Sequence, residues 1–105
     1  MFNDKVVIIT GGAQGIGKCI AEEFQKRHAN VCVIDKLPNE YFIGDLAEEE
    51  TLVRFSEKVI SDYGKVDVLV NNALPLMKGI NQCSYEDFYY ALRVGVTAPF
   101  YLSKL

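Results

Sequence analysis

The sequence carries little positive charge, has no long apolar run and begins without an apolar leader. Its 11 lysines and arginines are outnumbered by 14 aspartates and glutamates, giving a formal net charge of −3. Such a balance provides no basic surface for nucleic acid or for an anionic membrane. No apolar run approaches bilayer length, and the N-terminus lacks a basic segment followed by an apolar one. We therefore expect a cytoplasmic protein that has neither nucleic acid nor a membrane as its partner.

Cysteine and histidine are also scarce. The cysteines Cys19, Cys32 and Cys83 are odd in number and widely spaced, which fits no metal or redox pattern. We expect reduced thiols, with Cys19 and Cys32 packed in the core. The single histidine, His28, follows two cations at the predicted end of a helix, where positive charge suits the helix dipole. The sequence thus predicts no metal site and no catalytic histidine.

The most informative segment is an apolar strand that runs directly into a glycine-rich turn and a helix, residues 6–17, VVIITGGAQGIG. Gly11 lets the chain turn off the strand, Gly15 lets the backbone approach a bound group, and Gly17 lets the helix pack near the strand. Free N–H groups at a helix start face an anion, reinforced by the helix dipole. The segment predicts a pyrophosphate site, whose candidate residues are Gly11, Gln14, Gly15, Ile16 and Gly17.

An acidic residue follows at the distance that a dinucleotide site requires. The apolar run 31–34 ends in Asp35, eighteen residues after Gly17. A carboxylate there accepts hydrogen bonds from the adenosine ribose and repels a 2′-phosphate, so it favours NAD(H) over NADP(H). The adjacent Lys36 can weaken that preference through a charge contact. The alternative interpretation is that Asp35 only opens a surface loop.

Two motifs together resemble the short-chain dehydrogenase/reductase family. They are Thr10-Gly11-x-x-x-Gly15-Ile16-Gly17 and the Asn71-Asn72-Ala73 that follows a later strand. The resemblance covers essentially the whole chain and implies that residues 1–105 form the NAD-binding Rossmann half of such an enzyme. It further implies that two residues lie beside the adenine, Asp45 and Leu46. The residues that it places beside the nicotinamide ribose are Asn71, Asn72 and Ala73.

The apolar pattern predicts the fold. Four strands, at residues 6–9, 31–34, 41–43 and 66–70, alternate with helical stripes, which indicates an α/β fold. With right-handed crossovers this becomes a Rossmann-type doubly wound parallel sheet of strand order 3-2-1-4. Asn30 is predicted to adopt a left-handed cap before the second strand, and Gly64 to end the second helix. Asp45 has a second possible role, as the N-cap of that helix.

The connection between the second and third strands is unusually short. Only nine residues separate Asp35 from Asp45, and Pro38 and Asn39 argue against a helix there. Family members usually have a full helix at this point, so we expect one face of the sheet to be thinner than usual.

The last segment, residues 84–105, is apolar on every side and predicts a helix bent at Gly95 and Pro99. By resemblance it forms a subunit interface, so we expect a homo-oligomer. The chain departs from the family at Leu74-Pro75, where glycine is usual, and at Gly95, where asparagine is usual. By resemblance, Leu74-Pro75 lies near the nicotinamide, where it is expected to change the local path of the chain. Gly95 provides no side chain for the part in a proton relay that the resemblance gives to the asparagine.

The family's catalytic residues, a serine and a Tyr-x-x-x-Lys pair, have no counterpart in this sequence. None of its six tyrosines is followed four residues later by lysine. We therefore expect the cofactor-binding portion of an NAD(H)-dependent oxidoreductase for a small alcohol or carbonyl substrate, without a catalytic residue in this part. The alternative is a non-catalytic nucleotide-binding or interaction module. Residues 1–105 alone are expected to be inactive, and marginally folded or aggregated, because strand four would have an unpaired apolar edge.

Overall fold

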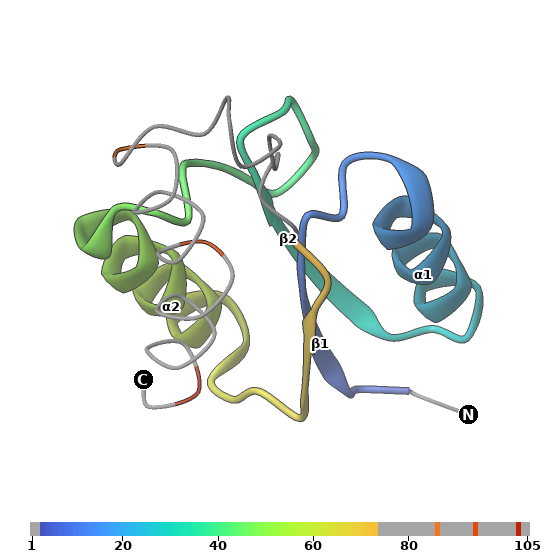
Figure 1. The fold of residues 1–105 in the computed structure, drawn as a ribbon. Coiled ribbons are helices and arrows are strands. Elements are labelled where there is room, and N and C mark those ends of the chain that lie inside the picture. The colour runs from blue at the N-terminus through green and yellow to red at the C-terminus, as the bar shows by residue number, and fades with distance from the viewer. Residues whose placement is uncertain (1–2, 74–85, 87–93, 95–102, 104–105) are drawn as a thin grey trace.

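The computed structural model describes residues 3–73 and the single residues 86, 94 and 103. In this part the elements are β1 (Val6–Thr10), α1 (Gly15–Lys26), β2 (Asn30–Asp35), β3 (Phe42–Ile43), α2 (Glu49–Tyr63) and β4 (Val68–Asn71). The four strands form one parallel sheet in the order β3-β2-β1-β4. Helix α1 lies on one face of the sheet and α2 on the other (Figure 1). The α/β fold and the strand order 3-2-1-4 are therefore confirmed, with β1 inside the sheet.

The core consists of two apolar layers, one on each face of β1. All five residues of β1 are buried, and successive side chains point to opposite faces. Val6 and Ile8 belong to the α2 layer, which centres on the fully buried Phe55. Val7 and Ile9 belong to the α1 layer. This two-sided burial is why β1 is a continuous apolar run and why its carboxyl end, which leads into the glycine-rich turn, is held firmly in place.

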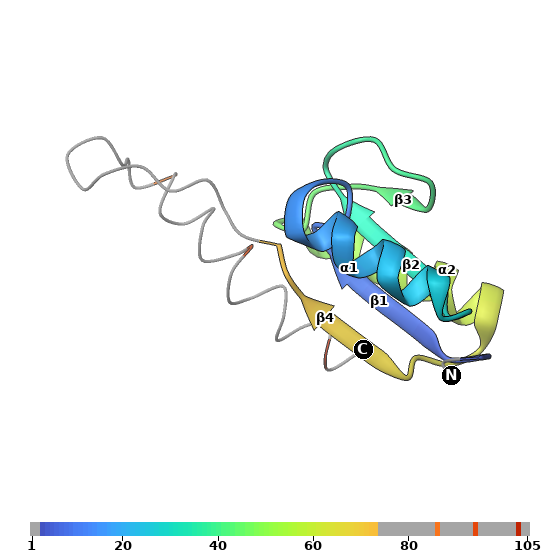
Figure 2. The same cartoon turned by 90° about the vertical axis from the view of Figure 1, so that its right-hand side faces the viewer.

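The connection from β2 to β3 contains no helix, as Pro38 and Asn39 predict. Strand β3 is only two residues long, and Tyr41 lies just outside it. Phe42 packs into the α2 layer, so alternation turns Ile43 to the α1 face, where 58% of it is exposed. Figure 2 shows β3 at one edge of the sheet and β4 at the other. The thinner face expected at the short connection stays a prediction.

Several expectations need correction. The left-handed residue before β2 is His28, with φ 69°, and not Asn30, whose N–H donates to the Lys5 carbonyl at 2.8 Å as β2 begins. Cys19 is exposed on α1, because the side of that helix that faces the sheet is formed by Ile20, Ala21 and Phe24. Cys32 is buried, as expected.

Strand β4 starts at Val68, later than expected. The Asp67 carboxylate accepts the Val6 N–H at 2.8 Å, and the Asp67 N–H donates to the Val6 carbonyl. The three apolar residues of β4 are half-buried, because β1 is the only strand paired with β4 among the described residues. Gly64 ends α2 in the left-handed conformation, as predicted. The expectations for Cys83, Leu74, Pro75, Gly95, Pro99 and the last helix fall outside the described residues.

Candidate functional site

The candidate site is the rim of the sheet formed by the carboxyl ends of β1, β2 and β4. Such rims are where open parallel sheets bind ligands. The glycine-rich turn leads from β1 to α1 along this rim (Figure 1). Gly11 has φ 69° and donates its N–H to the Ile34 carbonyl at 2.9 Å, so the turn is fastened to the end of β2. A Cβ at Gly11 would lie 2.9 Å from the Ala73 Cα. Ala73 therefore lies directly against the turn.

Gly17 makes room for a contact between the turn and the end of β4. The Asn72 side-chain amide donates to the Gly11 carbonyl at 3.1 Å. A Cβ at Gly17 would overlap both the Gly11 carbonyl oxygen and this amide nitrogen. The absence of a side chain at Gly17 thus permits a close contact of α1 with the glycine-rich turn and with Asn72.

Thr10 organises the same corner, a role that was not predicted from the sequence. Its buried hydroxyl oxygen accepts the N–H groups of Asn72 and Ala73, each at 3.1 Å. The hydroxyl donates to the Val70 carbonyl at 3.4 Å. A hydroxyl at the end of an otherwise apolar strand is the signal that could have identified it, because a buried polar group needs partners. Thr10 holds the chain leaving β4 against β1.

The start of α1 is open. Gln14 is the N-cap, in an extended conformation and without a side-chain hydrogen bond to the helix, and the first turn of this fully described helix contains no acidic residue. Lys18 makes the first helical bond, to the Gln14 carbonyl at 3.2 Å, so the earlier N–H groups have no helical acceptor. Gly15 has φ 59°, with nothing within 4 Å of the place a Cβ would take, and Ile16 is 75% exposed. An anion can approach this end of the helix dipole.

Asp35 lies between the glycine-rich turn and the loop that follows β2. One carboxylate oxygen accepts the Ala13 N–H at 3.0 Å, and the other accepts the Leu37 N–H at 3.0 Å. Each oxygen has capacity for a second hydrogen bond. The bond to Leu37 belongs to the loop that follows β2, and the bond to Ala13 brings the same carboxylate to the candidate rim.

Asp45 and Leu46 follow β3, next to Gly44, whose N–H donates to the Asp35 carbonyl at 2.9 Å. The Asp45 carboxylate accepts the Ala47 N–H at 2.9 Å, but the N-cap of α2 is Glu48. The helix-cap interpretation of Asp45 is therefore wrong, because the chain makes a further turn before α2 begins. Leu46 is buried in the α2 layer of the core.

The described residues thus bring most of the candidates together. Hydrogen bonds and close contacts join the glycine-rich turn to Asp35 on one side and to Asn72 and Ala73 on the other. Asn71 is the exposed last residue of β4, beside them. No group of acidic, histidine or cysteine side chains suited to a metal ion occurs in the part of the chain that the structure describes.

The model of the short chain dehydrogenase family matches residues 5–105. An uncharacterized oxidoreductase of Thermotoga maritima is 36% identical over 121 residues, covering 98% of this chain and 47% of that protein. The chain belongs to the short-chain dehydrogenase/reductase family. The structure of an apo SCOR enzyme from Clostridium thermocellum matches with a TM-score of 0.86 and 38% identity, over 99% of this chain and 47% of that one.

A further relative in the family is L-rhamnose 1-dehydrogenase (NADP(+)) of Thermoplasma acidophilum, 32% identical over 84% of this chain and 39% of its own length. The present chain spans about half the length of such relatives. A solved structure of 3-ketoacyl-(acyl-carrier-protein) reductase from Brucella melitensis, 25% identical, contains NADH, whereas the name of the Thermoplasma acidophilum relative specifies NADP(+). Among the described residues, no helix has the length and apolarity needed to cross a membrane.

Proposed function

We propose that residues 1–105 are the cofactor-binding portion of an NAD(H)-dependent oxidoreductase acting on a small alcohol or carbonyl substrate. The observation that carries the proposal is the pairing of an open helix start at Gly15 with a carboxylate, Asp35, hydrogen-bonded to the same turn. These are the two features that a dinucleotide needs, one for the pyrophosphate and one for the adenosine ribose. When bound, the nicotinamide ring supplies the hydride acceptor or donor.

In this proposal the N–H groups at the start of α1 bind the pyrophosphate, with Gly11, Gln14, Gly15, Ile16 and Gly17 as the contributing residues. Asp35 accepts the hydroxyls of the adenosine ribose through its remaining oxygen lone pairs. Asp45 and Leu46 lie beside the adenine, Leu46 through its backbone because its side chain is buried in the core. Asn71, Asn72 and Ala73 border the nicotinamide ribose.

The preference for NAD(H) follows from charge. Asp35 is half-exposed and carries a negative charge at the place where NADP(H) would present its 2′-phosphate. The two anions would repel each other, and the carboxylate cannot move away without losing its bonds to Ala13 and Leu37. The exposed Lys36 is adjacent and attracts a phosphate, so the balance between these neighbours is what an experiment must measure.

Titration calorimetry of the intact protein with NADH and NADPH tests the proposal. We expect tighter binding of NADH than of NADPH. Asp35→Ala should reduce the ratio Kd(NADPH)/Kd(NADH) by about tenfold, the equivalent of a charge-assisted hydrogen bond of about 1.5 kcal/mol. Glu40→Ala is the matched control, because it removes an exposed charge from the same loop. Equal or tighter binding of NADPH by the unmodified protein would mean that Lys36 dominates.

The activity and the assembly of the whole protein belong to the same proposal. We propose a cytoplasmic homo-oligomer that associates through the segment 84–105, with the substrate-binding and catalytic groups outside residues 1–105. The alternative of a non-catalytic nucleotide-binding module makes a different prediction for the intact protein. Such a module binds NADH but produces none when NAD and a panel of secondary alcohols are supplied.

A further inference from the structure

We propose that Asn39, supported by Tyr41, is a positioning residue that holds the helix-free loop between β2 and β3 and so fixes Asp35 for its contact with the adenosine ribose. The inference rests on the proposed function. It assigns a role in cofactor selectivity to residues that do not touch the dinucleotide.

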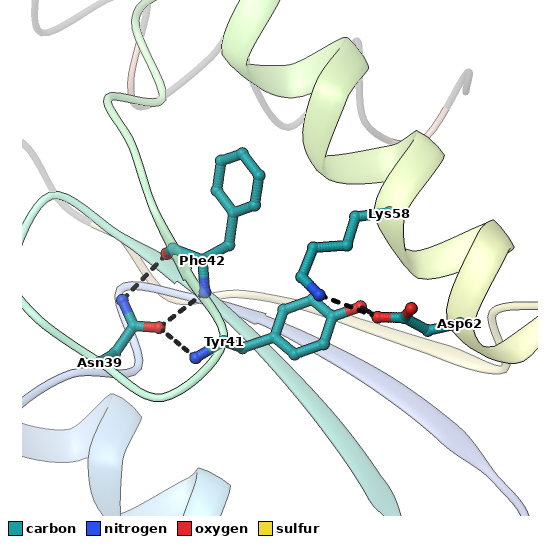
Figure 3. A network of polar contacts seen from close by, with 5 residues as sticks. All are labelled: Asn39, Tyr41, Phe42, Lys58 and Asp62. Atoms are coloured by element: carbon teal, nitrogen blue, oxygen red, sulfur yellow. Dashed lines mark hydrogen bonds and ion pairs between the residues drawn. The ribbon is translucent and has the colours of Figure 1, made fainter.

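The Asn39 side chain makes four hydrogen bonds within this loop. Its oxygen accepts the N–H groups of Tyr41 and Phe42, both at 2.9 Å. Its nitrogen donates to the carbonyls of Leu37 at 3.0 Å and Phe42 at 2.9 Å. These bonds use the full capacity of a carboxamide, two acceptor lone pairs and two donors. One side chain therefore ties both arms of the loop together, as Figure 3 shows for the arm at Tyr41 and Phe42.

The loop held by Asn39 is the one that orients Asp35. Leu37 donates its N–H to one Asp35 oxygen at 3.0 Å, while its carbonyl accepts from Asn39. The other Asp35 oxygen accepts the Ala13 N–H of the glycine-rich turn. A continuous series of hydrogen bonds thus runs from the glycine-rich turn through Asp35 and Leu37 to Asn39. If Asn39 releases Leu37, one of the two bonds that orient the carboxylate is weakened.

Tyr41 fastens the far arm of the loop to α2. Its hydroxyl donates to the Asp62 carboxylate at 2.7 Å, and Lys58 reaches the same carboxylate at 3.0 Å (Figure 3). The Lys58 ammonium also lies 4.4 Å from the centre of the Tyr41 ring, within the range of a cation–π contact. The ring packs edge-on against the buried Phe55, with 6.1 Å between the ring centres. The loop is therefore fixed to the core as well as within itself.

A loop of this length without a helix would otherwise be mobile, because it has few residues to bury and its ends alone are held by the sheet. A mobile loop would let Asp35 turn away from an incoming 2′-phosphate, which would reduce the discrimination between the two dinucleotides. Holding the loop in advance removes that freedom, which is the general advantage of preorganisation.

The test compares Asn39→Asp and Tyr41→Phe with the unmodified intact protein by titration calorimetry with NADH and NADPH. Asn39→Asp preserves the shape of the side chain but places an oxygen against the carbonyls of Leu37 and Phe42. Tyr41→Phe preserves the ring and removes the hydroxyl, and with it the bond to Asp62 and the contact with the Cys32 thiol. We expect each change to reduce the selectivity ratio, Kd(NADPH)/Kd(NADH), by about fivefold, the value of one net hydrogen bond.

The ratio is the informative quantity because a purely structural role changes the fraction of folded protein and leaves the ratio unchanged. The matched controls are Tyr63→Phe, at the end of α2, for Tyr41→Phe and Asn3→Asp, on an exposed turn, for Asn39→Asp. Both controls should leave the ratio unchanged. If Asn39→Asp does not fold, Tyr41→Phe decides the question alone. Folded variants that retain the full ratio overturn the inference while leaving the proposed function intact. Failure of the unmodified protein to bind either dinucleotide overturns both.

Discussion

Replacing Gly17 by alanine tests whether the close approach of α1 to the rim is needed for both stability and binding. The added methyl group would overlap the Gly11 carbonyl and the Asn72 amide, and would lie 3.0 Å from the Gly11 carbonyl carbon. Two of these atoms form the hydrogen bond between Asn72 and Gly11. The substitution therefore forces α1 outward or breaks that bond.

The magnitude follows from three contributions. Overpacking at a tight contact costs about 1–3 kcal/mol, and the lost hydrogen bond costs about 1 kcal/mol. The higher helix propensity of alanine offsets up to about 1 kcal/mol. We therefore expect Gly17→Ala to lower the free energy of unfolding by about 1–4 kcal/mol. Movement of the helix start away from the pyrophosphate by even part of an ångström should also weaken NADH binding about tenfold, equivalent to about 1.4 kcal/mol.

Urea unfolding gives the first quantity and titration calorimetry of the folded protein the second. Gly64→Ala is the control, because Gly64 has φ 77° with nothing within 4 Å of the added methyl and lies at the far end of α2. Its left-handed backbone should cost about 1 kcal/mol of stability without changing NADH affinity. A Gly17→Ala protein of unchanged stability and unchanged affinity would refute the packing argument.

Two further predictions concern titratable groups. Burial raises the pKa of the Cys32 thiol to about 11. Iodoacetamide at pH 7.5 should therefore modify the exposed Cys19 in the native protein and Cys32 only after unfolding, which peptide mass spectrometry would show. Equal modification of both cysteines in the native protein would contradict this. The Val6 N–H, and then Lys65, lower the pKa of the Asp67 carboxyl. Because the unfolded chain then binds more protons, the stabilisation by Asp67 is complete above the ordinary carboxyl pKa of about 3.9 and is lost as pH falls through the lower folded pKa. The difference in Tm between the unmodified protein and Asp67→Asn should therefore be largest near neutral pH and should become smaller as the pH falls below about 4. A difference in Tm that does not change with pH would contradict this.

The sheet could be predicted from the sequence because its signals are local. The β1 run is apolar on both faces, and the glycine-rich turn after it is typical of the passage from a strand to a helix. The chain after β2 could be predicted to lack a helix because Pro38 and Asn39 stand where a helix would need to start. These are consequences of backbone sterics and of side-chain burial, which act over a few residues.

The details of the rim could not be predicted in the same way, because they depend on the path of the folded chain. The partners of Thr10 are at least sixty positions away in sequence. The four bonds of Asn39 require the loop to fold back on itself. Asparagine adopts the left-handed conformation more readily than most residues, yet the pairing of β2 with β1 begins at Asn30, so the left-handed residue is His28.

A crystal structure of the intact protein with NADH is the most direct test of the central claim that this rim binds the dinucleotide. We expect the pyrophosphate over the N–H groups of residues 15–17, the adenosine ribose hydroxyls on the Asp35 carboxylate, and the nicotinamide ribose beside residues 71–73. Asp35 should retain its bonds to Ala13 and Leu37 in the complex. NADH bound elsewhere, or an adenosine ribose that makes no contact with Asp35, would contradict the account.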